Sequence, residues 1–482
     1  MLTCSLPVLS AMSRPSLLAP RYTLHHAAIG MLVLLEYLQS VMLAFGSHAV
    51  STGVGATPQQ FSLAAACYAA VAVLMILGHR WWVQRLGYRR MLRWSLLAFG
   101  GGALLCALAS TPAAFIAARM VQALGGAAFF TASRVQIMHY QGPARLQAMV
   151  FLPGGIMLGS GLAPLLAAGL LAVGRWQALF LVMLPLVWLA DWLVRRAVPA
   201  HEPIANVRPD RAHPWAIALL AAGVFLLQFV LERARFALRS DGATLWALGA
   251  AACGLLLLYL RHEWRRRTPL VPYHRFTSER YLWGMGVYGV GYLVVSGTAY
   301  VLPLYMAHGL GMDPLHSGLW LSITGLLALP FAILHLALML RWPNVRRYLF
   351  AGGLMLAAAA VLLALAQPGN PAWLLPAGLF LLHSLFMPFF LGTTAAATFS
   401  QVDEQVFSHA YQVKNAMREV ANAVGLSWGV IILQQRSMAH APQLAGAGSG
   451  PLLLQAGQDF FWLLAAMGLG LALFLRLQRR FV

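Results

Sequence analysis

Charge is scarce in this 482-residue sequence. Charged residues make up 10% of the chain, and only 13 residues are acidic. Lysine occurs once, at Lys414, and no GxxxxGK[ST] segment precedes it, which excludes a nucleotide-binding P-loop. The HExxH pair of zinc proteases is missing as well. We therefore do not expect an enzyme.

Cysteine is also rare, which limits metal and redox chemistry. The chain has four cysteines, and none shows CxxC or metal-ligand spacing. Cys4 precedes the first apolar stretch, whereas Cys67, Cys106 and Cys253 lie within apolar stretches. We expect buried free thiols, no metal site and no cofactor.

Hydrophobic residues, by contrast, make up 60% of the chain, and the mean hydropathy is +0.72. A helix of about 20 apolar residues crosses the hydrocarbon core of a bilayer. We therefore predict an all-α polytopic membrane protein with fourteen spans. They cover residues 27–49, 60–79, 94–111, 113–133, 148–172, 177–194, 215–232, 243–260, 282–305, 317–340, 348–366, 373–396, 415–434 and 459–475.

The positions of the arginines predict the orientation of these spans. With the N-terminus in the cytoplasm, we place 26 of the 33 basic residues on the cytoplasmic side and two, Arg119 and Arg418, within the membrane. Both termini are then cytoplasmic. The segment before Tyr22 lacks a sustained apolar core, so we do not interpret it as a cleaved signal, and Met1 and Met12 remain alternative starts.

The same distribution accounts for the formal net charge of +20. Arginines in short connections beside spans orient the helices and contact anionic lipid headgroups. A nucleic-acid partner is therefore not expected.

Arginines crowd the connection after the second span, Arg80-Trp-Trp-Val-Gln84-Arg85-Leu-Gly87-Tyr-Arg89-Arg90. A short loop with a glycine turn and several arginines suits the clamping of two helix ends. The connection resembles the G-x-x-x-D-R-x-G-R-R signature of major facilitator transporters. Arg80 stands at the glycine position of that signature and Gln84 at the aspartate position. The resemblance implies a gating loop made of Gln84, Arg85, Gly87, Arg89 and Arg90.

Arg119 lies well inside the fourth span. An arginine there costs about 2.5–3.5 kcal/mol on insertion scales, so we expect it to face a wet cavity or a carboxylate. With Gln122 it resembles the R-x-x-Q-G motif of the same transporters.

Small residues recur in the fifth span, where Gly155, Gly159, Gly161 and Pro164 should allow close helix packing and a bend. They resemble the antiporter motif G-x-x-x-G-P-x-x-G-G. The W-x-x-x-F-x-x-x-x-P pattern that begins at Trp176 is similar to the sixth span of fourteen-span drug:proton antiporters.

Later motifs continue in the same order. Leu231-Glu232-Arg233 and Glu263 with Pro269 resemble the family's L-D-R and E-x(n)-P-L. Asn415, Arg418 and Gly425 resemble its N-x-x-R-x-x-G-x-x-x-G, and we expect Arg418 to neutralise the adjacent Glu419. Over about residues 30–434 the chain thus resembles the EmrB/QacA type of transporter.

That resemblance implies the major facilitator fold, with two six-helix bundles and two inserted spans. The expected division is a cytoplasmic segment at 1–26, a first bundle at 27–196, a linker with the inserted spans at 197–265, and a second bundle with a short tail at 266–482.

The first span departs from the family pattern L-D-x-T-x-x-N-V-A-x-P. Gln39, Ala44 and His48 stand at its aspartate, asparagine and proline. Glu36 lies one helical turn before Gln39, on the same face. Since ionised carboxylates are costly in a bilayer, we hypothesise that Glu36 carries the proton coupling. A permanently protonated glutamate with a packing role is the alternative.

The resemblance implies a transporter in the cell or inner membrane that exports amphipathic small molecules in exchange for protons. A periplasmic adaptor and an outer-membrane channel are conceivable partners where the host has two membranes. A proton-independent uniporter or exchanger and a membrane-embedded enzyme or sensor are the alternatives. The residues expected to line the substrate cavity are Tyr37, Gln39, Arg119, Gln122, Phe129, Tyr288 and Tyr292.

Overall fold

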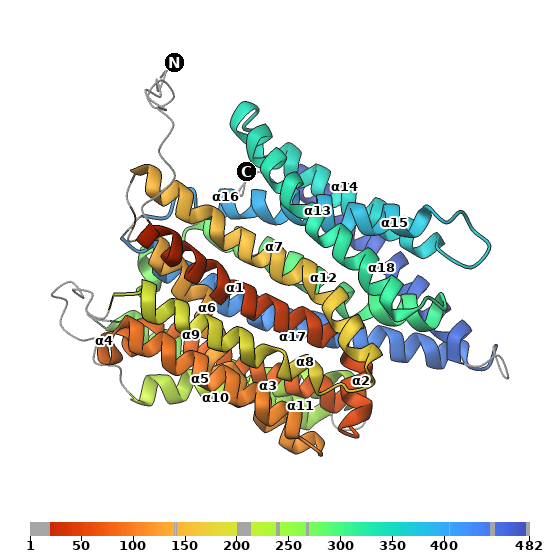
Figure 1. The fold of residues 1–482 in the computed structure, drawn as a ribbon, viewed down its shortest axis with the longest axis horizontal. Helices are drawn as coiled ribbons and strands as arrows, with labels where there is room; N and C mark the ends of the chain where they lie inside the picture. The colour runs from red at the N-terminus through yellow and green to blue at the C-terminus, as the bar shows by residue number, and fades with distance from the viewer. Residues whose placement is uncertain are drawn as a thin grey trace.

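A computed structural model of the 482-residue chain describes most of the sequence, and helices form almost all of what it describes (Figure 1). The described residues are 20–138, 140, 142–199, 214–237, 242–266, 269–403, 405–443 and 449–478. Cys4 and both candidate start methionines lie outside them.

The first bundle is formed by the N-terminal helices, which pack on one another and are drawn in red to yellow in Figure 1. They are α1 (Pro20–Phe45), α2 (Ser47–Gly53), α3 (Pro58–Leu77), α4 (His79–Leu86), α5 (Tyr88–Leu108), α6 (Pro112–Met138), α7 (Gly142–Ala172), α8 (Ala178–Leu181) and α9 (Met183–Ala197).

The second bundle contains the C-terminal helices. They are α12 (Glu279–Leu304), η2 (Tyr305–Gly309), α13 (Pro314–Arg341), α14 (Val345–Leu365), α15 (Leu374–Leu379), η3 (Phe380–Gly392), α16 (Thr393–Phe399), α17 (Phe407–His440) and α18 (Ser449–Leu477). A short 3-10 helix, η1 (Tyr273–Arg275), precedes α12.

Two further helices stand between the bundles in the sequence and pack as a pair outside them. These are α10 (Pro214–Ala237) and α11 (Gly242–Arg265), of which α10 contacts α3 and α17. Glu263 anchors the return to the second bundle, because its buried carboxylate accepts a 2.5 Å hydrogen bond from the Leu270 N–H.

The two bundles meet along two seams. One is the contact of α3 with α17, and the other is the contact of α7 with α13. Within the bundles, α1 packs on α7, and α12 packs on α17. The helices α1 and α17, which are almost 400 residues apart in sequence, meet through side chains at the contact of the bundles, where Arg418 pairs with Glu36.

Thirteen helices in the described part of the chain are long and apolar enough to cross a membrane. The remaining predicted span, 215–232, corresponds to α10, whose described apolar stretch Trp215–Leu231 is shorter. Several predicted boundaries were wrong. The thirteenth span begins at Phe407 rather than at 415, so Lys414, which we had placed at the cytoplasmic side, lies inside α17 and is buried.

Two prolines coincide with irregular helical segments. Pro303 ends the regular part of α12 and is followed by the π-helical η2, while Pro388 lies inside the π-helical η3. Proline lacks an N–H and clashes with the carbonyl four residues earlier, so the backbone rearranges at these points.

Two of the three cysteines in apolar helices are buried, Cys67 and Cys106, whereas Cys253 is exposed on α11. The expectation of a buried thiol at 253 was wrong because α11 packs mainly on α10 and leaves the rest of its surface open.

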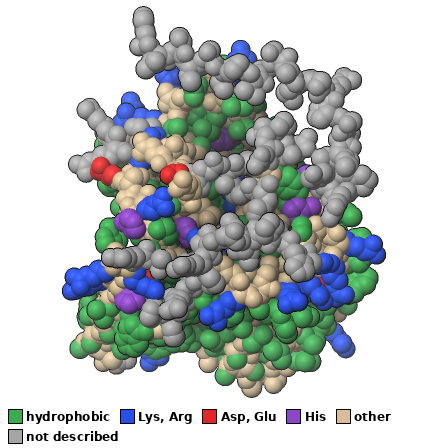
Figure 2. Space-filling model, turned by 90° about the vertical axis from the view of Figure 1, so that its left-hand side faces the viewer, with side chains coloured by type: hydrophobic (Ala, Val, Ile, Leu, Met, Phe, Trp, Pro, Cys, Tyr) green, Lys and Arg blue, Asp and Glu red, His purple; other side chains and the backbone are tan. Residues whose placement is uncertain are grey.

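Exposed arginines gather at one end of the molecule, which we call the basic end. It is the left side of Figure 1, where α1 begins and α4 lies, and Figure 2 shows it face-on. Exposed arginines from the helix termini and connections at this end include Arg85, Arg90, Arg195, Arg196 and Arg265.

Close packing of α7 on α1 depends on glycine. A Cβ atom at Gly159 would lie 2.7 Å from the Leu34 carbonyl oxygen and 3.1 Å from the Leu38 nitrogen. The backbone of α1 therefore occupies the space that a side chain would need. Gly161 allows close packing at the seam between α7 and α13, because a Cβ there would lie 2.8 Å from Leu326 of α13.

We predict that Gly159→Ala lowers the stability of the purified protein by about 1–3 kcal/mol, the usual cost of overpacking. Thermal melting in detergent measures this change. Gly154→Ala is the matched control, since Gly154 is in the same helix and a Cβ there would meet no atom within 4 Å. Equal melting temperatures for the two variants would contradict the proposed role of Gly159.

Candidate functional site

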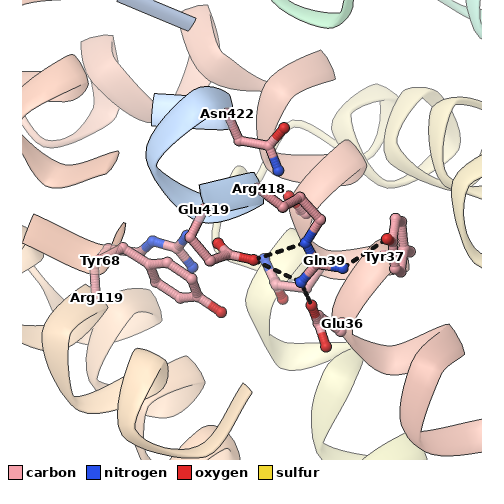
Figure 3. Close-up of a pocket in the computed structure, with 9 residues that line it drawn as sticks. Glu36, Tyr37, Gln39, Tyr68, Arg119, Arg418, Glu419 and Asn422 are labelled. Atoms are coloured by element: carbon pink, nitrogen blue, oxygen red, sulfur yellow. Dashed lines mark hydrogen bonds and ion pairs between the residues drawn. The ribbon is translucent and has the colours of Figure 1, made fainter. Parts of the chain in front are cut away.

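A buried group of three charged residues joins α1 to α17 (Figure 3). Arg418 of α17 forms ion pairs with Glu36 of α1 and with its own neighbour Glu419, where the Nη2–Oε1 distance is 2.6 Å. The three side chains are 2%, 9% and 11% exposed, in the order Arg418, Glu36, Glu419. We call this group the triad. It confirms that Arg418 pairs with Glu419, and it adds Glu36 as a second partner.

Further hydrogen bonds hold the triad in place. The Phe130 N–H of α6 donates to Glu36 Oε2 at 3.0 Å, and Arg418 Nη1 donates to the Tyr37 hydroxyl at 2.7 Å. The Phe130 ring also lies 4.6 Å from the Arg418 guanidinium carbon. Burying an ion pair is tolerated only when its remaining donors and acceptors are satisfied, and these contacts satisfy them.

The triad does not balance its charge. Two carboxylates against one guanidinium give a formal charge of −1 when both carboxylates are ionised. One proton on either carboxylate brings the group to zero. Proton binding at Glu36 would also remove an ion pair that links the two bundles.

A small cavity of about 40 Å³ lies beside the triad. A buried water needs about 10–15 Å³ by this measure, so the cavity has room for a few waters. Drug-sized ligands need about 300–1,000 Å³, so this conformation is closed around its centre. The lining residues are Glu36, Tyr37, Gln39, Ser40, Tyr68, Arg119, Arg418, Glu419 and Asn422.

Unpaired polar atoms face this cavity region. Both amide atoms of Gln39 and the Nε of Arg119 are buried without a hydrogen-bond partner in the protein. Gln39 is 2% exposed. A buried polar group without a partner costs about 1–3 kcal/mol, so these atoms are ready to bind water or a ligand.

Arg119 lies opposite Glu36 and Tyr37, beside Tyr68 (Figure 3). It donates to the Gln122 side chain, and its guanidinium carbon lies 4.3 Å from the centre of the Tyr68 ring. Within the described part of the chain, Arg119 has no carboxylate within ion-pair distance. The expectation that it faces a cavity is confirmed, and its closest contacts are an amide and an aromatic ring.

The structure places the other predicted cavity residues outside the lining. Gln122 is buried behind Arg119. Phe129 packs against Phe99 of α5, with the ring centres 5.3 Å apart. Tyr288 and Tyr292 of α12 stack on each other at 5.6 Å, next to Lys414.

Lys414 is a buried cation that the sequence interpretation missed. It is 3% exposed, and four aromatic rings surround its ammonium group. The distances from Nζ to the ring centres are 4.8 Å for Tyr411, 5.1 Å for Phe130, 5.2 Å for Tyr288 and 5.4 Å for Tyr292. We call these four residues the aromatic cage. Rings in such positions attract a cation, each by about 0.5–2 kcal/mol.

A layer of contacts closes the bundles between the triad and the basic end. Phe130 of α6 stacks on Tyr411 of α17, with the ring centres 5.8 Å apart. The Arg134 guanidinium lies 5.0 Å from the Tyr411 ring and 5.3 Å from the Phe407 ring. Farther out, Arg80 of α4 lies 3.1 Å from His409 Nε2. Each contact joins the first bundle to the second.

The predicted gating loop forms α4 and the turn after it. Gly87 has φ +76°, a value that favours glycine, and the expected glycine turn is confirmed. Arg85 stacks over Trp81 at 4.2 Å, and Arg89 donates to the Arg195 carbonyl. His79, at the start of α4, is buried, and its Nε2 lies 3.4 Å from the Tyr88 hydroxyl.

Other side chains of this loop reach the end of α9. Gln84 is half-buried and Arg90 is exposed, and Arg93 pairs with Asp191 of α9 at 2.9 Å. Arg195, on the same helix as Asp191, pairs with this carboxylate as well.

The motif of the thirteenth span lies in α17. The Asn415 amide lies 3.3 Å from the Thr131 hydroxyl of α6, and Gly425 abuts the Leu293 backbone of α12. The string 425–429 also matches the G-x-S-x-G pattern of serine hydrolases. Here it is plain helix, and the Ser427 hydroxyl donates to the Ala423 carbonyl at 2.8 Å, so it does not form a nucleophile elbow.

We predict that Arg418→Gln destabilises the protein by about 3–5 kcal/mol, because it leaves two buried carboxylates without their cation. Arg436→Gln, on the same helix, is the control. Its guanidinium is 57% exposed and lies 3.7 Å from Asp459, so its loss should cost about 0–1 kcal/mol.

Thermal melting of the two variants and of Arg418→Gln combined with Glu36→Gln tests the prediction. The double variant should recover part of the lost stability. Equal melting of the Arg418 and Arg436 variants would show that the triad does not hold the bundles together.

Comparisons with known proteins agree with this architecture. Two relatives are both named "Putative multidrug resistance protein MdtD". The one from Klebsiella pneumoniae subsp. pneumoniae is 26% identical over 352 residues, 72% of this chain and 73% of the relative. The one from Cronobacter sakazakii is 24% identical over 452 residues, 91% of this chain and 90% of the relative.

Solved structures share the fold at low identity. A D-xylose-proton symporter has a TM-score of 0.64 at 14% identity and covers 94% of this chain and 96% of its own. The human organic anion transporter MFSD10 has a TM-score of 0.58 at 16% identity, covering 95% of this chain and 100% of its own.

The family model described as "Major Facilitator Superfamily" matches residues 29–426, which include the triad, the cavity, the aromatic cage and both seams. This chain is a multi-pass membrane transporter and belongs to the Major Facilitator Superfamily.

Proposed function

We propose that this protein is a secondary transporter of the EmrB/QacA type that exports amphipathic small molecules in exchange for protons. The observation that carries the proposal is the buried ion pair between Glu36 of α1 and Arg418 of α17, one residue from each bundle. The names of the multidrug-resistance relatives support the export of organic molecules. The fourteen-span type rests on the motif order and on α10 as an additional span.

The orientation follows from the basic end. Cytoplasmic connections of membrane proteins are rich in arginine and lysine, so we place the basic end in the cytoplasm. Both termini then lie on the cytoplasmic side of the cell or inner membrane. In a host with two membranes, a periplasmic adaptor and an outer-membrane channel would carry the exported molecule onward.

Alternating access explains why the central cavity is so small. Transporters of this class expose a midplane site to each side in turn as one bundle rocks against the other. In the conformation shown, contacts between α6 and α17 close the cytoplasmic side. Ser40, which lines the cavity farther from the basic end than Glu36, is exposed. Opening at the basic end would enlarge the site for a substrate from the cytoplasm.

Glu36 is the group through which a proton would act. When Glu36 is ionised, it forms an ion pair with Arg418 and so links α1 to α17. When Glu36 is protonated, this ion pair is lost, and Arg418 remains paired with Glu419. The bundles could then move apart. Inward movement of each proton supplies about 2.3 kcal/mol per 100 mV of membrane potential.

A proton-independent exchanger is the second candidate. The family aspartates of the first span and of the gating loop are Gln39 and Gln84 here, which removes two of the carboxylates that such transporters use. Gln39 nonetheless lines the cavity, and both of its amide atoms lack a partner in the protein. Such an amide suits the binding of a dedicated polar substrate.

We predict that Glu36→Gln abolishes proton-driven accumulation while the protein remains folded. One pH unit is worth 1.36 kcal/mol, which supports about tenfold accumulation per proton exchanged. Ethidium and 8-anilinonaphthalene-1-sulfonate uptake into everted vesicles with an acidic lumen measures the accumulation. The parent should concentrate at least one dye, and Glu36→Gln should only equilibrate it.

Asp313→Asn is the control, because Asp313 caps α13 at an exposed position and asparagine caps helices equally well. It should accumulate dye like the parent. Equal gradient-driven accumulation by the parent and Glu36→Gln would exclude Glu36 as the coupling group. Transport by the parent that ignores the pH gradient would favour the exchanger.

A further inference from the structure

The ammonium group of Lys414 is buried without an anionic partner. Lys414 is 3% exposed, and within the described part of the chain its Nζ donates one hydrogen bond, to the Asn415 side-chain oxygen at 3.3 Å. Among the described residues, no carboxylate lies within 4.0 Å of Nζ. The aromatic cage surrounds the group instead. An ammonium carries three donors, so this one has unused capacity for an acceptor.

The charges around Lys414 favour an anion as well. Three basic side chains are buried near the contact of the bundles, those of Arg119, Lys414 and Arg418. The acidic side chains buried there are those of Glu36 and Glu419. With all five groups ionised, three positive and two negative charges give a formal net charge of +1, and a proton on Glu36 would raise it to +2. Buried charges are normally paired. The site is therefore poorly suited to an organic cation and lacks one anion.

The aromatic cage is built from both bundles. Phe130 belongs to α6 of the first bundle, whereas Tyr288, Tyr292 and Tyr411 belong to α12 and α17 of the second. Lys414 itself is on α17, one helical turn nearer to the basic end than Arg418. Separation of the bundles at the basic end would withdraw Phe130 and leave Lys414 beside the stacked pair Tyr288 and Tyr292.

We propose that Lys414 binds the anionic group of the substrate, and that the substrate is an amphipathic organic anion with an aromatic or other flat apolar part. The inference rests on the proposed transport function and names its substrate class. Tyr288 and Tyr292 are aromatic rings on which an apolar ring of the substrate would stack. The carboxylate or sulfonate of the same molecule accepts hydrogen bonds from Lys414.

The aromatic cage also explains release. When the bundles close at the basic end, Phe130 returns to Lys414 and stacks on Tyr411. The rings then take the place of the substrate anion around the ammonium. The substrate loses its binding partner and moves to the side where the cavity lies, beyond the triad. The membrane potential, negative inside, favours this outward movement of an anion.

Two dyes of opposite charge test the proposal. 8-Anilinonaphthalene-1-sulfonate is an aromatic anion, and ethidium is an aromatic cation. Thermal melting of the purified parent, Lys414→Gln and Lys414→Arg is recorded with each dye, since a ligand that binds the folded state raises its melting temperature. Uptake of both dyes into everted vesicles is measured for the same proteins.

The sulfonate should raise the melting temperature of the parent and of Lys414→Arg, and should do so far less for Lys414→Gln. A lost charge-assisted hydrogen bond should weaken dye binding by about tenfold or more. Uptake of the sulfonate should fall to a similar extent in Lys414→Gln, and uptake of ethidium should not fall. The melting temperature of Lys414→Gln without dye is the reference from which the dye-induced shift of this variant is measured.

Other results would overturn the proposal. Equal sulfonate binding by the parent and Lys414→Gln, or a preference of the parent for ethidium, would exclude Lys414 as the anion-binding group. If the sulfonate did not change the melting temperature of the parent, Lys414 would also be excluded as the anion-binding group. A Lys414-dependent shift without uptake of either dye would support the anion site and contradict the proposed transport function instead.

Discussion

The ion pair between Glu36 and Arg418 is the interaction on which the centre of the molecule depends. It joins the first helix of the first bundle to the long helix α17 of the second, and both side chains are almost completely buried. The hydrocarbon core of a bilayer contains no water that could solvate such charges, so each charge must be paired inside the protein. The Phe130 N–H, the Tyr37 hydroxyl and Glu419 complete the arrangement. Changing the charge of one carboxylate therefore changes the contact between the bundles.

The kind of contact around this ion pair changes in order along the axis between the two membrane faces. At the basic end the bundles are joined by arginine and aromatic contacts, with Arg134 over Phe407 and Tyr411. Deeper in, Lys414 lies in its aromatic cage, followed by the triad and then by the small polar cavity. Positive charges thus outnumber negative ones along the predicted substrate path. This order would suit the loading side, the charged centre and the release side of the proposed export cycle.

The signature loop illustrates how a family feature can persist with other residues. In the resemblance drawn from the sequence, Gln84 stands at the aspartate position of the signature and Arg80 at its glycine position. Arg80 lies 3.1 Å from the His409 imidazole at the start of α17. The contacts of Arg80 with an imidazole and of Arg134 with aromatic rings are weaker than a buried ion pair. Such a closure suits a gate that has to open in every transport cycle.

The amino-acid sequence by itself determined that this protein resides in a lipid bilayer, that it is all-helical and where most of its spans lie. Bilayer insertion depends on the length and polarity of local stretches, which are visible in the sequence. The sequence also singled out Glu36, Arg119 and Arg418, since charges within apolar stretches are visible without a structure. Only the tertiary structure decided their partners. Residues 36 and 418 meet across 382 positions, and no local pattern specifies such a contact. For the same reason Lys414 resembled a loop residue until packing placed it among rings from three helices.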